Sequence, residues 1–412
     1  MDENLANELF FSKEAADYLG ISTQRLNTLV KEGKIQPLKK SPSGTIFLLE
    51  ELKKRKEEQR VFSTSVQGSK EGMFKLDTDE KNEAVNYATL MNVLDCTEQK
   101  LDPIFSRFSE TVNVSIPLIS NDVIGKYCEI FKVDSSLLSK EYESSKRAFS
   151  NLRETDEIIK RGSQDYPPLL VTTEQAPRFL YIRGKKSLLY EKRTVALVGS
   201  RQASDRAKEA TGELAKKLGE NGITIISGLA KGIDVSAHEA ALKNGFNTIA
   251  VIGTNLNQYY PIENKETQIE IEEKGLVVSQ FSPANKTQRW FFPLRNGVMS
   301  GLSLATVIME AGETSGALKQ ADFALKQGRE VLIPQSALDM KTIAWPKKYV
   351  EKGAKAVKNS KDVLRILAES DIFRINKNES RQQTIEDLLD DNTVETNQES
   401  IQWINQMSVS GI

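Results

Sequence analysis

Residues 194–234 read TVALVGSRQASDRAKEATGELAKKLGENGITIISGLAKGID, and this stretch decides the fold. Two short apolar runs, TVALV and ITIIS, stand on either side of a helical segment, and each ends in a loop that contains glycine. The alternation continues with the runs FNTIAVIG, GLVVSQ, LATVIMEA and EVLIP, again separated by helical segments. Continuous apolar strands that alternate with helices predict an α/β fold with a doubly wound parallel sheet, covered by helices on both faces.

The loops after the first two strands are candidate phosphate sites. Gly199 and Ser200 let backbone N–H groups approach an anion, the following helix adds positive potential, and Arg201 adds a planar fork of donors. The second loop combines two glycines, a hydroxyl and an amine: Ser227, Gly228, Lys231 and Gly232. Neither the G-x-G-x-x-G spacing of NAD sites nor a G-x-x-x-x-G-K-[ST] loop is present. The pattern therefore favours a nucleic-acid backbone or a nucleotide over NAD or an ATPase site.

The composition excludes several further classes of function. The 412 residues predict two or three domains, and 56 Lys and Arg against 57 Asp and Glu exclude a globally basic protein but not a local basic groove. Two cysteines cannot form a zinc quartet, and one histidine leaves at most one acid–base role for that residue type. We expect no catalytic residue, metal or cofactor. No run is long and apolar enough to span a membrane, and no signal peptide is visible, so we expect a cytoplasmic protein.

Changes of composition predict the domain organisation. We expect a winged helix-turn-helix at 1–62, a linker at 63–79, a helical module at 80–160, the α/β domain at 161–368 and an acidic tail or partial helical domain at 369–412. The 42 residues from Asp371 onward carry eight acidic and three basic side chains, a net charge of −5. This tail is too short for a full domain.

The N-terminal segment FSKEAADYLGISTQRLNTLVKEGKIQP predicts two short helices joined by a tight turn that contains glycine. With E-A-A-x-x-L-G-I-S followed by E-G-K-I, it resembles the excisionase/MerR-like winged helix-turn-helix family over roughly residues 10–58. The second helix and the wing would present polar and basic side chains to duplex DNA: Thr23, Gln24, Arg25, Asn27, Thr28, Lys39 and Lys40. A small helical bundle that serves only protein contacts remains the alternative.

Ordered blocks in the α/β region carry a second resemblance. DYPPLL, PRFLYIRG, VALVGSR, SGLAKGIDVSAHEAAL, YYPIEN, FFPLRNGVMSGLS, VIMEA and SGALKQADFALKQGREV resemble the DNA-processing protein A (DprA/Smf) family over about residues 160–358. The resemblance implies an extended Rossmann-like fold, single-stranded DNA binding, a homodimer and a mediator that assists loading of a RecA-type recombinase in DNA uptake, recombination or defence. It also implies a phosphate pocket formed by the two loops above, with Phe292, Arg295 and Asn296 around the same groove.

The chain departs from the family pattern at several positions around this pocket. Gly297 stands where the family has a second arginine, Gln320 replaces a threonine and Gln335 replaces a glycine. Two alternative functions therefore stay open: a nucleotide-sensing DNA-binding regulator, and a nucleotide-processing enzyme with a LOG-like Rossmann site and Glu310 as its base. Glu310 can instead shape the pocket, and we expect His238 to be a packing residue and Asp234 to be a helix N-cap.

Overall fold

The computed structural model describes residues 9–19, 23–31, 35–41, 44–53 and 74–369. The chain forms two compact units, residues 1–72 and 73–412, and we describe each by itself. The acidic tail and most of the expected linker lie outside the described residues. Among the residues described, we find no helix with the length and apolar character needed to span a membrane.

The smaller unit combines helices with a small antiparallel sheet. Its elements are β1 (Leu9–Phe11), α2 (Ser12–Leu19), α3 (Thr23–Lys31), β2 (Lys39–Ser41) and β3 (Gly44–Leu48), and the strand order is β1-β3-β2. Its core consists of apolar residues from both helices, the sheet and the segments around them: Ala15, Ala16, Leu19, Leu26, Leu29, Ile35, Phe47 and Leu52.

The larger unit is built on a nine-stranded sheet with the order β12-β11-β10-β6-β7-β8-β9-β5-β4. Its strands are β4 (Glu157–Lys160), β5 (Phe179–Gly184), β6 (Thr194–Val198), β7 (Thr224–Ser227), β8 (Thr248–Val251), β9 (Leu276–Ser279), β10 (Ala305–Ile308), β11 (Glu330–Pro334) and β12 (Lys355–Val357). The parallel strands start at β6 in the middle of the sheet. From there β7, β8 and β9 extend to one side, and β10, β11 and β12 extend to the other.

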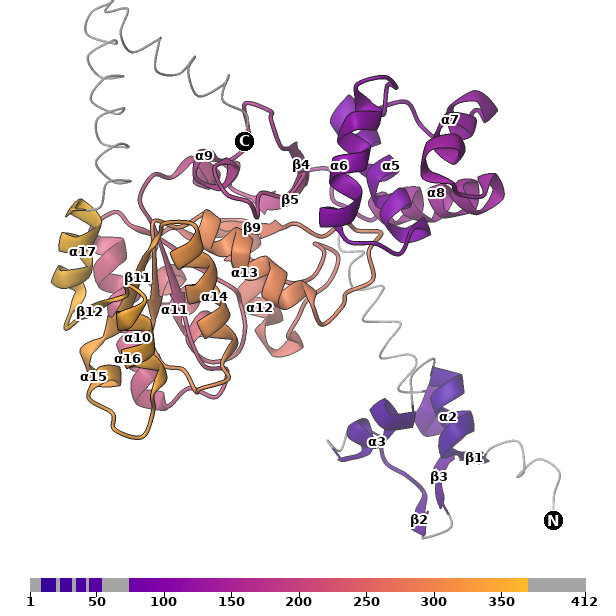
Figure 1. The fold of residues 1–412 in the computed structure, drawn as a ribbon. Coiled ribbons are helices and arrows are strands. Elements are labelled where there is room, and N and C mark those ends of the chain that lie inside the picture. The colour runs from indigo at the N-terminus through magenta and orange to yellow at the C-terminus, as the bar shows by residue number, and fades with distance from the viewer. Residues whose placement is uncertain (1–8, 20–22, 32–34, 42–43, 54–73, 370–412) are drawn as a thin grey trace, which may run out of the picture. The chain divides into compact units, whose positions relative to one another are not determined.

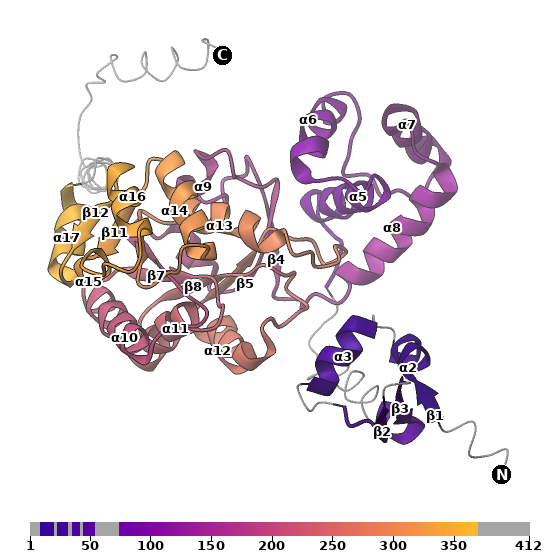
Figure 2. The same cartoon turned by 60° about the horizontal axis from the view of Figure 1, so that its bottom comes forward.

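Helices cover both faces of this sheet (Figures 1 and 2). Alternate residues of β6 point to opposite faces, since Val195 and Leu197 share a core with α10 (Asp205–Glu220), α11 (Ile233–Lys243) and α17 (Ser360–Glu369). Ala196 and Val198 share the opposite core with α9 (Pro168–Val171), α13 (Phe291–Gly301), α14 (Gly316–Lys326) and α16 (Trp345–Glu351). The remaining elements are α12 (Lys265–Lys274), α15 (Gln335–Leu338) and the 3₁₀ turns η1 (Lys186–Tyr190) and η2 (Ile262–Asn264). The doubly wound α/β fold is confirmed.

The sheet is mostly parallel, as predicted, but two strands at one edge pair antiparallel. β5 pairs antiparallel with β9, and β4 pairs antiparallel with β5. Strands that pair antiparallel need no long crossover helix, and β4 is joined to β5 by residues 161–178, which include the short helix α9. The α/β domain therefore starts at β4, a few residues before the expected boundary at 161.

Four helices precede the sheet: α5 (Asp79–Val93), α6 (Glu98–Ser109), α7 (Asn121–Phe131) and α8 (Ser135–Phe149). Thr78, Ser120 and Asp134 cap three of them, because each side chain accepts a hydrogen bond from a backbone N–H of the first turn. Their apolar core is continuous with residues of the sheet such as Ala250 and Val277. The helical module and the sheet thus form one body.

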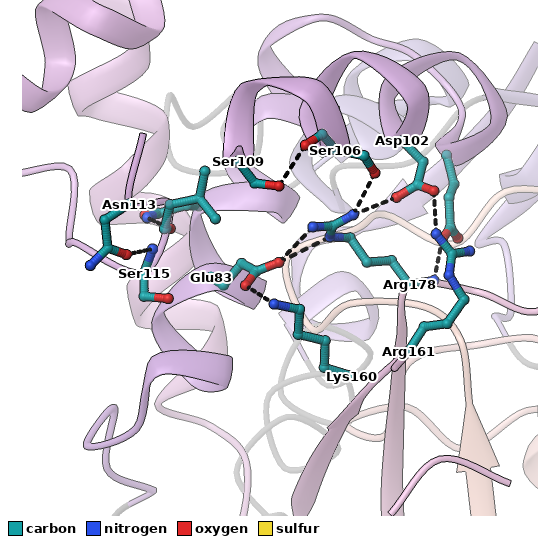
Figure 3. A network of polar contacts seen from close by, with 12 residues as sticks. Glu83, Asp102, Ser106, Ser109, Asn113, Ser115, Lys160, Arg161 and Arg178 are labelled. Atoms are coloured by element: carbon teal, nitrogen blue, oxygen red, sulfur yellow. Dashed lines mark hydrogen bonds and ion pairs between the residues drawn. The ribbon is translucent and has the colours of Figure 1, made fainter. Parts of the chain in front are cut away.

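A buried ion network joins this helical module to the edge of the sheet (Figure 3). Arg178, which precedes β5, donates to Glu83 of α5 through Nε and Nη2, at 3.0 and 2.9 Å, and to Asp102 of α6 at 2.9 Å. Lys160 of β4 donates to the other oxygen of Glu83 at 2.6 Å. Glu83 and Arg178 are only 1% and 7% exposed, so removal of either charge would leave the other buried with one ion-pair partner fewer.

Candidate nucleic-acid interface

The site lies where the strand order reverses, between β6 and β10. The chain leaves these neighbouring strands toward opposite sides of the sheet, which opens a crevice at their carboxyl ends. Gly199 follows β6 in close contact with its surroundings: a Cβ there would lie 2.5 Å from Cγ1 of Ile233 and 2.8 Å from the carbonyl oxygen of Glu310. Only glycine fits this turn.

A groove of about 800 Å³ occupies this crevice. Four cationic side chains line it, namely Arg201, Arg289, Arg295 and Lys319. Residues of the first turn of α14 also line the groove, and the N–H groups at a helix N-terminus attract anions. The other lining residues are mostly apolar or small: Val198, Gly199, Ser200, Gln202, Ala230, Asp234, Tyr260, Phe292, Pro293, Asn296, Met299, Gly312, Thr314, Ser315, Gly316, Ala317 and Gln320.

Arg295 is the buried cation of the groove, at 5% exposure. Its Nη1 donates to the carbonyls of Gly228 and Val251, and its Nε donates to Asn296 at 3.2 Å. Burial lowers the pKa of Arg295 to about 10, and the charge of buried Asp234 opposes that shift. Among the described residues no hydrogen-bond partner is found for Nη2.

The second glycine loop is closed by the chain's own carboxylate. Asp234 accepts a hydrogen bond from the backbone N–H of Ala230 at 3.4 Å, and burial raises its pKa. The expectation that Asp234 is the N-cap of α11 is wrong, because Gly232 holds that position with φ +78°. Asp234 instead lies in the first turn of α11 and accepts a hydrogen bond from the loop, where the sequence suggested that a phosphate would bind.

Four predicted phosphate contacts of the second loop do not line the groove. The Ser227 hydroxyl is wholly buried and donates to the carbonyl of Leu197 at 2.6 Å, so its expected phosphate contact is corrected to a structural bond. The Gly228 carbonyl is bound by Arg295, and Gly232 shapes the turn. Lys231 lies outside the lining and pairs with Glu263 at 2.8 Å. Of the ten predicted residues, the groove brings together Gly199, Ser200, Arg201, Phe292, Arg295 and Asn296.

The backbone of the first loop is also engaged within the chain. The N–H of Ser200 donates to the carbonyl of Glu310 at 2.7 Å, and its Oγ accepts from the N–H of Gln202 at 3.1 Å. The N–H groups of Ser200 and Gln202 are therefore already used within the chain, whereas the cationic side chains and the N-terminus of α14 line the groove. Sequence reasoning could not foresee this, since it treated loop N–H groups as free.

An aromatic pair stands beside the cations. Phe292 packs against Tyr260 with ring centroids 5.1 Å apart, and the Arg201 guanidinium lies 6.0 Å from the Phe292 centroid. Tyr260 is 51% exposed, so its ring is available to a flat ligand. Aromatic faces of this kind stack on nucleobases of any sequence.

Two residues considered for catalysis have structural partners. The Glu310 carboxylate accepts hydrogen bonds from the N–H and the Oγ of Ser204, at 3.0 and 2.7 Å, and so holds the start of α10. His238 is wholly buried, and its Nδ1 lies 2.7 Å from Oγ1 of Thr248. Burial lowers the His238 pKa to about 3. Both observations favour the pocket-shaping and packing interpretations.

The three departures from the family pattern occupy different places. Gln320 lines the groove but is wholly buried. Gly297 faces Gln175, whose Cγ would lie 2.7 Å from a Cβ at that position, so a larger side chain requires this neighbour to move. Gln335 begins α15 and lies outside the groove lining.

In the smaller unit, the residues predicted to contact duplex DNA lie on two elements. Thr23, Gln24, Arg25, Asn27 and Thr28 belong to α3, while Lys39 and Lys40 belong to β2. Thr23, Asn27 and Lys39 are exposed, and the side chains of the other four lie outside the description.

Sequence reasoning missed half of the groove's cations and one of its aromatic rings. Arg289, Lys319 and Tyr260 come from segments far from the glycine loops, and only the fold brings them to the same crevice. One signal was available, because Arg289 lies two residues before the block FFPLRN and Lys319 lies within the block SGALKQA, and the sequence analysis singled out both blocks.

Comparison with known proteins shows what the α/β region is similar to. Residues 157–368, which include every strand of the nine-stranded sheet, match the family model for DNA recombination-mediator protein A. The chain is similar to the DNA processing protein DprA of Bacillus subtilis, with 34% identity over 214 residues, 52% of this chain and 72% of that relative. Similarity to the Streptococcus pneumoniae DprA is 37% over 235 residues, 57% of this chain and 78% of the relative. The X-ray structure of DprA from S. pneumoniae aligns with a TM-score of 0.57 and 30% identity, covering 70% of this chain and 97% of that structure.

Proposed function

This chain belongs to the DNA recombination-mediator protein A family, and on that basis we propose that its groove binds the backbone and bases of single-stranded DNA. The observation that carries the proposal is the meeting of four cationic side chains and an aromatic pair in one crevice at the carboxyl edge of the sheet. The family's name describes a mediator of DNA recombination, and a groove that binds DNA fits that role.

The groove suits single strands more than duplex. Arg201, Arg289 and Lys319 are exposed at its walls and can neutralise phosphates, while the buried Arg295 adds a fourth cation to the lining. Phe292 and Tyr260 supply ring faces that only an unpaired base can reach. Phosphate contacts and ring stacking carry no sequence information, so we expect binding to tolerate many sequences.

The test uses the full chain and a fluorescent oligo(dT), with a duplex of the same length as competitor. The proposal expects tight single-strand binding that Arg201→Ala weakens by about tenfold, corresponding to about 1.4 kcal/mol. Arg206→Ala is the matched control, because Arg206 is an exposed arginine on α10 that does not line the groove. Equal loss in both variants, or preference for duplex, would contradict the proposal.

Three finer parts of the proposal rest on the family relationship and on the smaller unit. The protein would act as a homodimer and assist loading of a RecA-type recombinase onto the bound strand. The smaller unit, with exposed Thr23, Asn27 and Lys39 on α3 and β2, would add duplex contacts as a winged helix-turn-helix. A recombinase-filament assay with and without this protein tests the role in recombinase loading, and duplex binding by Asn27→Ala with Lys39→Ala tests the duplex contacts of the smaller unit.

A further inference from the structure

We propose that Trp290 is a second base-stacking site, which extends the single-stranded DNA track from the groove over the loop 284–290. This inference rests on the proposed function. It concerns a residue that the sequence did not single out and that does not line the groove.

The indole is exposed but held in place. Trp290 is 41% exposed, whereas its neighbour Phe291 is 4% exposed. The two rings meet edge to face at 4.6 Å with an interplanar angle of 84°, and Phe291 stacks on Phe281 at 3.9 Å. A buried ring stack therefore fixes the orientation of an exposed aromatic face, so little side-chain entropy would be lost when a base stacks on it.

The position of Trp290 continues the groove. Arg289 lines the groove and precedes Trp290 directly, while Phe292 lines it two residues later. Lys286, in the same loop, is exposed and adds a further cation on this side. Alternation of cationic and aromatic side chains along an exposed segment is the pattern that holds single strands without regard to sequence.

A packing role for the indole is the competing explanation. Trp290 also borders a cavity of about 40 Å³ between the loop and α5, together with Met91, Phe291 and Leu294. An apolar side chain of any shape would serve that role. Base stacking instead requires a flat ring. A substitution of Trp290 that keeps an apolar side chain but removes the flat ring therefore distinguishes the two explanations.

The experiment measures the affinity of the full chain for oligo(dT) of about 4 to about 16 nucleotides, the range of known single-strand site sizes. Three variants are compared: Trp290→Phe, Trp290→Leu and Trp290→Ala. We expect all of them to bind the shortest strands like wild type. On the longer strands Trp290→Phe should stay within about threefold of wild type, whereas Leu and Ala should both lose about tenfold. Thermal unfolding shows whether each variant is folded.

Fluorescence gives an independent readout. The chain has three tryptophans; Trp345 is 1% exposed, and Trp403→Phe removes the third indole. In that background, long oligo(dT) should quench emission, and the quenching should disappear in Trp290→Phe. If Trp290→Leu binds oligo(dT) of every length like wild type while Arg201→Ala weakens binding, the proposed stacking site at Trp290 is wrong and DNA binding in the groove is still supported. If the wild type binds no single strand, the proposed function itself fails.

Discussion

Nη1 of Arg295 donates to the carbonyl of Gly228 at 2.7 Å, so a residue of α13 closes the end of β7. The same nitrogen binds the carbonyl of Val251 at the end of β8. Arg295 thus fixes two strand ends and also lines the groove. Its structural role can be separated from its proposed role in DNA binding by comparison with an exposed arginine that lines the same groove.

Arg295→Met should destabilise the protein strongly. It leaves the Gly228 and Val251 carbonyls without a donor and Asp234 buried without its nearest opposite charge, which we expect to cost about 3–5 kcal/mol. Urea unfolding measures the loss. Arg289→Met is the control, because that arginine lines the same groove but is exposed. Its unfolding free energy should match wild type, and a comparable loss there would refute the structural role of Arg295.

Gly232→Ala should displace the backbone at Ser200, which lines the groove. A Cβ there would lie within 2.3 Å of the Ser200 carbonyl, and φ of +78° disfavours any side chain, so we expect a loss of about 1–3 kcal/mol and weaker DNA binding. Gly212→Ala on α10 is the matched control, since its Cβ would meet Ala240 at an ordinary 3.6 Å. That variant should be neutral or slightly more stable. Thermal unfolding of both tests the difference.

Acid should destabilise the protein through its one histidine. The pKa of His238 falls to about 3 in the folded state because burial disfavours the imidazolium. The unfolded chain protonates near pH 6.5 and the folded chain does not, so stability is lost as pH drops from about 6.5 toward 3. NMR of the tag-free protein with labelled histidine should show one imidazole that stays neutral from about pH 8 to about 5.5. A midpoint near 6.5 would mean that the residue is solvated.

Glu98→Gln should stabilise the protein at high pH. Burial raises the Glu98 pKa to about 7, with the charge of Asp102 adding to it and the N–H of Arg178 opposing it. The folded state therefore binds the extra proton between about pH 4.5 and 7, and that stability is lost as pH rises through this window. The amide mimics the protonated acid, so we expect a gain of about 1–3 kcal/mol at pH 8 that shrinks near pH 5. A gain of equal size at both pH values would rule out this cause.

The sequence allowed most of the fold and part of the site to be predicted. The six parallel strands from β6 to β11 were recognisable because each is a short apolar run followed by a loop or a helix. The strands β4, β5 and β12 were not, since two run antiparallel without crossover helices and the third has three residues. In the site, Gly199 and Arg201 were found from local pattern. Three features of the site depend on tertiary packing and could not be predicted. The Ser227 hydroxyl is bound inside the protein, Asp234 accepts a hydrogen bond from the second glycine loop, and Arg289 and Lys319 line the groove.

The salt dependence of single-strand binding tests the central claim most directly. For single strands the logarithm of the binding constant falls with the logarithm of salt by about 0.7 per phosphate contact. Arg201→Ala should make this slope shallower by about 0.7, because Arg201 lines the groove. Lys231→Ala should keep the wild-type slope, because Lys231 lies outside the groove and pairs with Glu263. A wild-type slope for Arg201→Ala, or an equal flattening by Lys231→Ala, would show that the DNA backbone follows the glycine loop instead of the groove.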